Sequence, residues 1–475
     1  MKTIILTILI SILVACSAFG TIKLPAILSD NMVLQQQSNV NLWGWAEPNS
    51  KITVKPSWSK KNNSTVADAN GKWELAVKTP VAGGPYDITI SDGKPVKLSN
   101  VLIGEVWICS GQSNMYQPMK GYHNGWFTDE TTDAINLAKP STPIRIANVE
   151  LTYNREIQQD CKVKWVVNCP ETVANAPSVA YFFAQYINKA LDVPVGIIHT
   201  SWGGSSISAW MSKELLQNQF PEVDLKILET NGDMDYPQNK PTVVYNAMLS
   251  PLRNFTAKGF LWYQGEANIR TPEQYEKMQI AMMNSWRRDF SNLEMPFYYV
   301  QLAPFKNDKI PEFSYGYFYE AQANILAKTK YSGMVVTVDV GNEKIVHPPK
   351  KKIVGERLAY WALAQTYGFK IQYRSPSFKT MSITGNKVQL EFNEADLGLH
   401  SSESSATGFE LAGEDHQFYP AEAIFSGKLI ELNSAKVDRP VAVRYCFRNG
   451  QIGHIYNNYG LPLIPFRTDS WEKLR

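Results

Sequence analysis

The feature that most constrains this chain is the alternation of short apolar runs with segments of helical spacing between residues 101 and 370. Strands joined by helices pair in parallel, so this alternation predicts a three-layer α/β domain over residues 101–370. The apolar runs expected to form strands lie at 101–108, 195–198, 258–263, 297–302 and 334–340. The segments expected to form helices lie at 179–191, 271–290, 318–328 and 352–367.

Strand patterns without intervening helices occupy the two flanking parts of the chain. In residues 21–100, runs such as 40–45 and 86–90 alternate apolar with polar or small residues and are separated by Asn, Gly and Pro turns. Residues 371–475 have the same character. We therefore expect β-sandwich-like N-terminal (21–100) and C-terminal (371–475) regions around the α/β domain.

The first twenty residues have the pattern of a signal peptide. Lys2 precedes an apolar stretch over 4–15, and Ala18-Phe19-Gly20 is a small-x-small cleavage site. Residues 13–16 also resemble a lipobox, in which Cys16 would carry a lipid. We expect a protein exported to the periplasm or secreted, with membrane contact only if Cys16 is lipidated.

Four cysteines follow this segment, and their pairing cannot be deduced from the sequence. Cys161 and Cys169 could close a short disulfide loop in an oxidising compartment, or all four could be free thiols. The other two are Cys109 and Cys446.

Composition and charge exclude some functions. The formal net charge is only +3, from 47 basic and 44 acidic residues, so neither a nucleic-acid partner nor an acidic membrane surface is expected. Thirteen Trp and 23 Tyr weakly favour a carbohydrate ligand, because aromatic rings stack on sugar rings.

The sequence contains no pattern of metal ligands. No His-Glu-x-x-His motif or other close ligand cluster occurs, so no metal site is expected. The basic run Lys350–Lys352 is expected to be a solvated helix start.

Four loops that follow or lie between these predicted elements contain residues suited to acyl transfer. The ligand crevice of an open α/β sheet lies beyond the carboxyl ends of its strands. Ser113 follows a Gly-containing turn there, Gly204 can offer a backbone N–H to an oxyanion, and Asn268 can offer a side-chain amide. A serine esterase needs a base of near-neutral pKa, and His347, in the loop before a helix, is the histidine placed to serve as one. Taken singly, each residue could instead be a cap or a turn residue.

Two further polar residues near these loops have a structural interpretation. His199, next to the Gly-rich loop, is expected to be a hydrogen-bonded histidine at a strand end. Glu266 is expected to be a buried hydrogen-bonding anchor rather than an acid catalyst. The remaining histidines lie in turn-rich stretches and are expected to be surface or structural residues: His123, His400, His416 and His454.

The order Ser, Gly, Asn, His resembles that of the SGNH hydrolases, and the local strings resemble the sialate O-acetylesterases within them. The resemblance covers nearly the whole chain after the predicted signal segment. The strings that carry it lie at 24–34, 110–115, 201–204, 245–252, 262–268, 347–348 and 460–469.

This resemblance implies an SGNH-hydrolase (flavodoxin-like) catalytic domain that needs no cofactor or metal. Ser113 would be the nucleophile and His347 its general base, while Gly204, Asn268 and the Ser113 N–H would form the oxyanion hole. The reaction would pass through an acetyl-serine intermediate. The partner would be an acetylated glycan or a free acetylated sugar, with O-acetylated sialic acid as the first expectation.

One position departs from the pattern of the family. Relatives usually carry Asp two residues before the histidine, where this chain has Ile345. Glu343 could take over as the orienting acid, or the site could work as a Ser-His dyad. Two alternatives to the sialic acid assignment stay open: an acetyl esterase on xylan or another plant polysaccharide, and a non-catalytic carbohydrate-binding protein on a degenerate esterase fold.

Overall fold

The computed structural model describes residues 22–471, with the exception of residue 124. The predicted signal peptide (1–20), and with it Cys16, therefore lies outside the described residues. Within these limits, no helix is both long enough and apolar enough to cross a membrane.

The four cysteines of the described residues are free thiols: Cys109, Cys161, Cys169 and Cys446. The short loop at 161–169 is therefore not closed by a disulfide.

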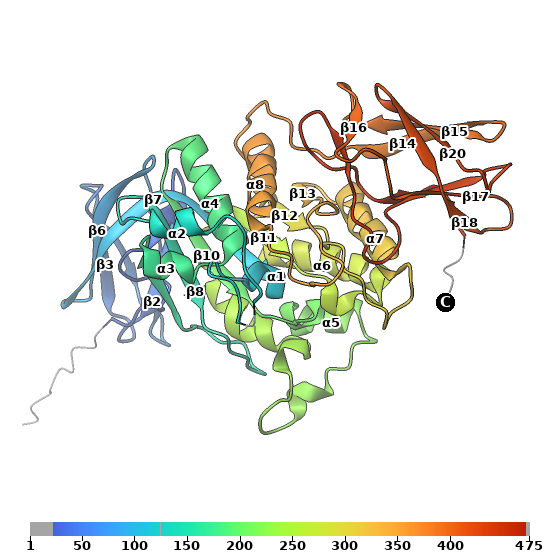
Figure 1. The fold of residues 1–475 in the computed structure, drawn as a ribbon. Helices are drawn as coiled ribbons and strands as arrows, with labels where there is room; N and C mark the ends of the chain where they lie inside the picture. Colours follow the sequence, from blue (N-terminus) through green and yellow to red (C-terminus); the bar gives the residue numbers. More distant parts are fainter. Residues whose placement is uncertain (1–21, 124, 472–475) are drawn as a thin grey trace, which may run out of the picture.

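A mixed sheet forms the centre of the molecule, with the N-terminal strands at one end and the C-terminal β region at the other (Figure 1). Neighbouring strands along its middle are parallel, except that β9 runs antiparallel to β8. Parallel pairing was predicted for the strands that recur here. In spatial order they are β13 (Ser332–Val335), β12 (Phe297–Val300), β11 (Gly259–Tyr263), β7 (Pro95–Gly111), β10 (Val195–Ser201), β8 (Ile144–Val149) and β9 (Val163–Val167).

The strand predicted at 334–340 is shorter than expected. It ends at Val335, and Val340 closes a turn by donating its N–H to the Thr337 carbonyl. Val338 and Val340 are nevertheless buried, so their apolar character reflects packing of a loop into the core rather than strand pairing.

Helices cover both faces of the central sheet. Successive strand residues point to opposite faces: Trp107 packs in the core that contains helices α4 and α8, whereas Ile108 packs in the core that contains α6 and α7. The four helices are α4 (Ser178–Leu191), α6 (Pro272–Asp289), α7 (Ser314–Lys328) and α8 (Lys351–Trp361). Helix α8 continues as the π-helical segment η7 (Ala362–Thr366), so the helix predicted at 352–367 has an irregular last turn.

Short helices connect these elements. The α-helical ones are α1 (Ser113–Tyr116), α2 (Thr132–Asn136), α3 (Pro170–Ala174) and α5 (Lys213–Gln219). The segments η1 (Ile207–Trp210), η2 (Lys226–Glu229), η3 (Pro237–Asn239), η5 (Ser250–Leu252) and η6 (Glu266–Asn268) are 3-10 helices, and η4 (Tyr245–Leu249) is π-helical.

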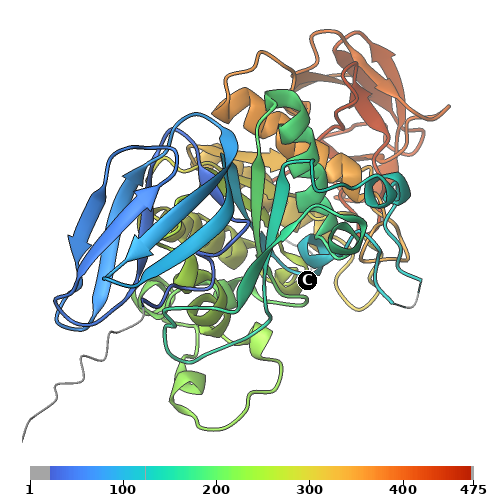
Figure 2. The same cartoon turned by 90° about the vertical axis from the view of Figure 1, so that its left-hand side faces the viewer.

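The N-terminal strands are joined to the central sheet by one long strand. Strand β7 is 17 residues long and passes without a break through residue 100, where a domain boundary was predicted. Its first part pairs with β6 and its middle part with β1, while its last part pairs with β10 and β11. The N-terminal strands are β1 (Val33–Gln35), β2 (Asn39–Trp45), β3 (Lys51–Pro56), β4 (Asn63–Val66), β5 (Lys72–Lys78) and β6 (Gly83–Ser91), which face the viewer in Figure 2.

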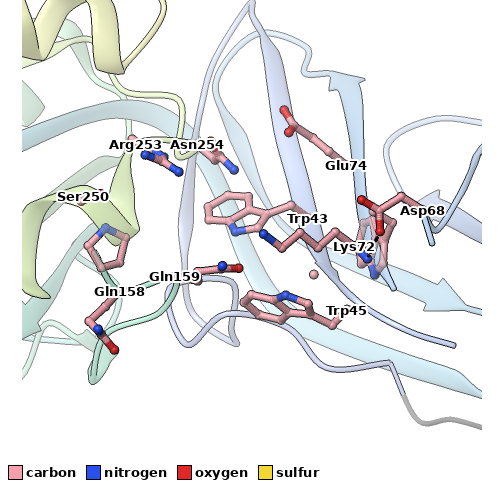
Figure 3. A pocket seen from close by; sticks show the side chains of 13 residues that line it. Trp43, Trp45, Asp68, Lys72, Glu74, Gln158, Gln159, Ser250, Arg253 and Asn254 are labelled. Carbon is pink, nitrogen blue, oxygen red and sulfur yellow. Dashed lines mark hydrogen bonds between the residues drawn. The ribbon is translucent and has the colours of Figure 1, made fainter. Parts of the chain in front are cut away.

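A pocket of about 340 Å³ lies between these strands and the α/β region (Figure 3). Trp43 and Trp45 of β2 line one side, and Arg253 and Asn254 line the other. Trp43 also packs edge-on against Phe255, with ring centroids 6.5 Å apart. The buried Trp43 is therefore explained by contact between the two regions.

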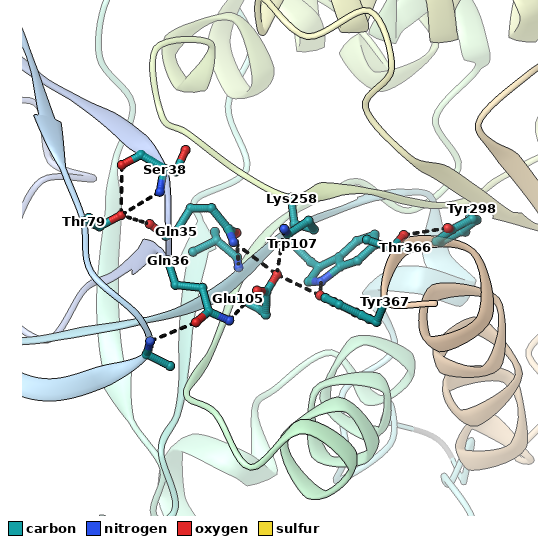
Figure 4. Close-up of polar contacts among 12 residues, drawn as sticks. Gln35, Gln36, Ser38, Thr79, Glu105, Trp107, Lys258, Tyr298, Thr366 and Tyr367 are labelled. Atoms are coloured by element: carbon teal, nitrogen blue, oxygen red, sulfur yellow. Dashed lines mark hydrogen bonds and ion pairs between the residues drawn. The ribbon is translucent and has the colours of Figure 1, made fainter. Parts of the chain in front are cut away.

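A buried carboxylate, Glu105 of β7, also connects the N-terminal strands with the α/β region (Figure 4). Glu105 is 2% exposed and accepts hydrogen bonds from Gln35 (3.1 Å), Gln36 (2.7 Å) and the Tyr367 hydroxyl (2.8 Å). The Lys258 ammonium lies 3.6 Å away. A buried carboxylate is tolerated only with such partners, and these come from β1 and its following residue, from the segment before β11 and from the end of η7.

The C-terminal region consists of antiparallel strands. Two four-stranded sheets have the orders β14-β15-β20-β19 and β18-β17-β21-β23, and β16 pairs with β22. Arg467 anchors this region to α7 through Glu320, at 2.9 and 3.0 Å. The strands are β14 (Ser377–Thr384), β15 (Lys387–Asn393), β16 (Leu399–Ser401), β17 (Phe409–Ala412), β18 (Phe418–Pro420), β19 (Glu422–Ser426), β20 (Leu429–Asn433), β21 (Ala442–Tyr445), β22 (Ile455–Asn457) and β23 (Phe466–Arg467).

Candidate active site

Three of the four predicted loops begin at the same edge of the central sheet. Strand β7 lies between β10 and β11 and is parallel to both. Gly111, at the end of β7, is in register with Ser201 of β10 and with Tyr263 of β11. The loops that carry Ser113, Gly204 and Asn268 therefore leave the sheet side by side, at its carboxyl edge.

Ser113 is the first residue of α1, directly after a turn that requires glycine. Gly111 has φ +140°, and a Cβ at this position would lie 2.1 Å from the Tyr263 carbonyl oxygen. Only glycine fits there without moving the neighbouring strand. The Gln112 N–H then donates to the same carbonyl at 3.0 Å, which fixes the direction in which the chain enters α1.

The loop after β10 packs directly against Ser113. A Cβ on Gly203 would lie 3.6 Å from the Cβ of Ser113, which shows how close the two segments are. Gly204 is exposed, with φ +73°, and no described residue accepts a hydrogen bond from its N–H. The Trp202 N–H donates to the Gly111 carbonyl at 3.0 Å and so ties this loop to the end of β7.

Asn268 is oriented by its own carbonyl oxygen. Its Oδ1 accepts hydrogen bonds from the Ile207 N–H (3.0 Å) and from Gln264 Nε2 (2.9 Å). Its Nδ2 donates to no described residue. The amide is thus held at one end, and the donor at the other end is free for a ligand.

His347 lies among aromatic rings next to the nucleophile loop. Its ring centroid is 5.4 Å from that of Tyr122 and 4.7 Å from that of Trp126. Tyr122 in turn donates its hydroxyl to the Ser113 carbonyl at 2.7 Å. The Asn114 side chain donates to the carbonyl of Val346 at 3.1 Å, which gives a second link between α1 and the His347 loop.

Burial, and after it the charge of Lys351, lowers the pKa of His347 to about 4. The imidazole is therefore neutral at pH 7 and able to accept a proton. Its Nδ1 is enclosed and has no hydrogen-bond partner among the described residues. This ring nitrogen is the one that an orienting acid would hold.

Neither nearby acid is bonded to this histidine. The side chain of Asp339 is 5% exposed and is paired in bidentate fashion with Arg357, at 2.7 and 2.6 Å. Glu343 is exposed, and its backbone carbonyl accepts from the Lys306 N–H at 3.0 Å. Its role as the orienting acid remains a prediction. No group of three or more His, Cys, Asp or Glu side chains that could hold a metal is found within the described residues.

Comparison with known proteins assigns the family. A sequence model described as a carbohydrate esterase, sialic acid-specific acetylesterase, matches residues 103–363, the region that contains all four predicted site residues. The chain belongs to this family. It is a carboxylic ester hydrolase.

Individual relatives span most of the chain. The sialate O-acetylesterase of Mus musculus is 25% identical over 90% of this chain and 89% of its own length. That of Homo sapiens is 26% identical over 77% of this chain and 75% of its own length. A crystal structure of a carbohydrate acetylesterase from Xanthomonas citri is 32% identical, with a TM-score of 0.85, and covers 95% of this chain and 100% of that one.

A second histidine of the esterase lies at the same sheet edge but is enclosed. His199 Nδ1 is 3.0 Å from Asn148 Oδ1, and its Nε2 is 2.5 Å from Ser201 Oγ. Burial lowers its pKa to about 3, so the ring stays neutral. His199 and Ser201 are 4% and 1% exposed. The prediction that His199 is hydrogen-bonded at a strand end is confirmed, whereas its purely structural role stays a prediction.

Sequence analysis missed two buried residues next to Ser113, Asn114 and Lys351, and its expectation for Lys351 was wrong. Asn114 was treated only as part of the Ser113 turn, although it is 1% exposed. Lys351 was predicted to be solvated within the basic run Lys350–Lys352, but it is fully buried and donates to Asn114 Oδ1 at 2.5 Å. Its position in the sequence was the available signal. Lys351 is four residues after His347 and is the first residue of α8, so it can share the buried face of that helix.

Proposed function

We propose that this esterase hydrolyses O-acetyl groups of a sugar through an acetyl-serine intermediate, with O-acetylated sialic acid as its substrate. One observation carries the proposal: Ser113 emerges at a sheet edge where the neighbouring loops hold two unused hydrogen-bond donors, Gly204 N–H and Asn268 Nδ2, and Tyr122 contacts both Ser113 and a neutral histidine. Helices on both faces of a largely parallel sheet support an SGNH-hydrolase type of fold for this region.

In the first step, Ser113 Oγ forms a bond to the acetyl carbonyl carbon while its proton passes to His347. The serine hydroxyl is a weak nucleophile until a base accepts this proton. The carbonyl oxygen becomes an oxyanion, which accepts hydrogen bonds from the N–H groups of Gly204 and Ser113 and from Asn268 Nδ2. The bond between the acetyl carbon and the sugar oxygen then breaks, and His347 returns the proton to the sugar hydroxyl.

In the second step, water attacks the acetyl-serine. His347 accepts a proton from the water, the same donors stabilise the second oxyanion, and acetate leaves as Ser113 recovers its proton. His347 Nδ1 is enclosed, so Nε2 is the ring nitrogen assigned to these transfers. We propose a Ser-His dyad, because Asp339 is committed to Arg357 and Glu343 faces solvent.

Aromatic side chains around His347 support a sugar as the substrate. Trp126 is 41% exposed and Tyr116 is 36% exposed. Tyr116 stacks on Tyr122 with ring centroids 6.3 Å apart, so the rings form a continuous aromatic wall next to the imidazole. Such faces pack against the apolar face of a sugar ring. The names of the mouse and human relatives support sialic acid in particular.

We also propose that the protein is exported, on the basis of the signal-peptide pattern of residues 1–20. Contact with a membrane would then depend on a lipid at Cys16.

The test compares acetate release by the wild type, Ser113→Ala and Ser201→Ala on O-acetylated sialic acid, acetylated xylan fragments and 4-nitrophenyl acetate. Ser201 is the matched control, since it lies on the neighbouring strand but is enclosed. We expect release from the sialic acid that is lost in Ser113→Ala and retained in Ser201→Ala. Release from xylan fragments alone would assign a plant polysaccharide instead. Equal inertness of the wild type and Ser113→Ala on every substrate would favour a carbohydrate-binding protein without activity.

A further inference from the structure

A buried polar cluster lies directly behind the nucleophile. It joins Asn114 of α1, Glu266 of η6 and Lys351 at the start of α8, three elements far apart in sequence. Asn114 and Lys351 are 1% and 0% exposed, and Glu266 Oε2 is enclosed as well. Charged groups buried next to an active site need a function or a compensating structure, because their desolvation is costly.

The side-chain amide of Asn114 is the centre of this cluster. Its Oδ1 accepts from Lys351 Nζ at 2.5 Å. Its Nδ2 donates to Glu266 Oε1 and, at 3.1 Å, to the carbonyl of Val346. Only a side chain with both an acceptor and two donors can make these contacts at once. Asn114 is also the residue directly after Ser113, and Val346 is the residue directly before His347.

The esterase lacks the usual means of orienting its base. A carboxylate at Nδ1 holds the imidazole in position and stabilises its protonated form. Here residue 345 is isoleucine, Nδ1 has no partner among the described residues, and the charged group that acts on His347 is the cation Lys351. The ring must therefore be oriented by other means.

We propose that Asn114 positions His347 in place of the missing carboxylate, by holding the Val346 carbonyl, and that Lys351 and Glu266 fix the Asn114 amide in the required orientation. The inference rests on the proposed function of Ser113 and His347. Lys351 and Glu266 are attached to opposite ends of one amide group, so neither end is free to rotate. Because Asn114 adjoins the nucleophile, the same side chain sets the distance between the two reacting groups.

The decisive experiment measures kcat and KM for acetate release by the wild type, Asn114→Ala, Ile345→Asp and the double variant. We expect Asn114→Ala to lower kcat by about 10²-fold, with KM within about threefold, because binding is intact and the base is misplaced. Ile345→Asp places a carboxylate where relatives carry one. In the Asn114→Ala background it should restore kcat at least about tenfold, whereas alone it should change kcat little.

Recovery of kcat by Ile345→Asp in the Asn114→Ala background distinguishes a positioning role of Asn114 from general damage to the fold. A loss of kcat that Ile345→Asp does not recover, or an Asn114→Ala enzyme with unchanged kcat, overturns the inference while leaving the proposed function intact. An inert wild type overturns both.

Lys351→Met is the second variant, and it stands in if Asn114→Ala does not fold. Removing the cation raises the pKa of His347, so the acidic limb of kcat/KM moves to higher pH, and kcat falls because the Asn114 amide loses one anchor. An unmoved acidic limb together with an unchanged kcat contradicts the proposed role of the cluster. Besides Lys351 and Glu266 of the cluster itself, the ionisable groups packed around it are Tyr122, Tyr263 and Tyr315, and this variant substitutes none of them.

Discussion

The two histidines at the carboxyl edge of the central sheet have opposite surroundings. His199 has a partner at each ring nitrogen, Asn148 and Ser201, and thus the residue types of a complete Ser-His-Asn set. It is enclosed, however, and so is its serine. His347 has no partner at Nδ1 among the described residues, and Tyr122 joins its ring to the half-buried Ser113, because the Tyr122 hydroxyl donates to the Ser113 carbonyl.

Under the proposed function the reactive histidine is His347, so a complete hydrogen-bond set like that of His199 is not by itself a mark of a catalytic base. The Ser201 hydroxyl is buried and already hydrogen-bonded, so a substrate carbonyl carbon cannot approach it. The Gly204 N–H and Asn268 Nδ2 have no partner among the described residues and can therefore donate to a ligand. Around His199, polar groups satisfy one another and stabilise the start of the Gly203–Gly204 loop. In the loops next to Ser113, by contrast, the Gly204 N–H and Asn268 Nδ2 donate to no described residue. Four predictions test this distinction.

The largest effect is expected from replacing each histidine by glutamine. His347→Gln should lower kcat by about 10³-fold or more, because no other group accepts the Ser113 proton. His199→Gln should keep kcat within about tenfold and instead lower the melting temperature, since a buried hydrogen-bonded ring is lost. Steady-state kinetics and thermal unfolding of both variants check this. A more severe loss of kcat in His199→Gln than in His347→Gln would exchange the two assignments.

The two asparagines give the next contrast. Asn268→Ala should lower kcat by about 10²–10³-fold, the usual result of removing one oxyanion donor. Asn148→Ala, which removes the partner of His199 Nδ1, should leave kcat within about threefold and reduce stability. Parallel kcat measurements with 4-nitrophenyl acetate decide between them. If Asn268→Ala retains full kcat, its Nδ2 does not contact the oxyanion.

The two histidines should also separate in their response to pH. Activity needs neutral His347, so the acidic limb of kcat/KM should lie near pH 4 rather than near pH 6.5. His199 has a pKa of about 3 in the fold and about 6.5 when unfolded, so the unfolded chain binds the extra proton as pH falls. Its contribution to stability is complete above pH 6.5 and is lost progressively below it, by roughly 3 kcal/mol at pH 4.

Urea unfolding between pH 4 and pH 7 measures the summed loss of both histidines, because the pKa of His347 is lowered as well, and His199→Gln should weaken the dependence by removing one of the two contributions. Initial rates taken before unfolding give the acidic limb separately. A limb near pH 6.5 would mean that His347 is solvated in the working enzyme.

The smallest effect is expected at Glu343. The carboxylate is exposed, so Glu343→Gln should change kcat by less than about twofold. A drop in kcat approaching the ~10⁴-fold associated with loss of an orienting acid would show instead that Glu343 moves onto His347 during turnover. The kcat of this single variant therefore tests the dyad directly.

Most of the helices and strands of the α/β region, and the residue types in the loops that follow them, could be recognised from the sequence. The apolar runs at 195–198, 258–263 and 297–302 became strands because burial on both faces requires apolar side chains at successive positions. Gly111 was recognisable as the residue of a sharp turn before Ser113, and its φ of +140° confirms the need for glycine. The local strings around Ser113, Gly204, Asn268 and His347 indicated the acetylesterase family that the sequence model over residues 103–363 confirms.

Only the tertiary structure decided which polar residues meet. Asn114 contacts Glu266 across 152 positions and Lys351 across 237, and no periodicity of the sequence records contacts at such separations. The burial of Lys351, the partners of His199 and the passage of β7 through the predicted boundary at residue 100 have the same origin. Sequence patterns report the environment of a residue along its own element, whereas the partner of a buried polar group depends on how distant elements pack.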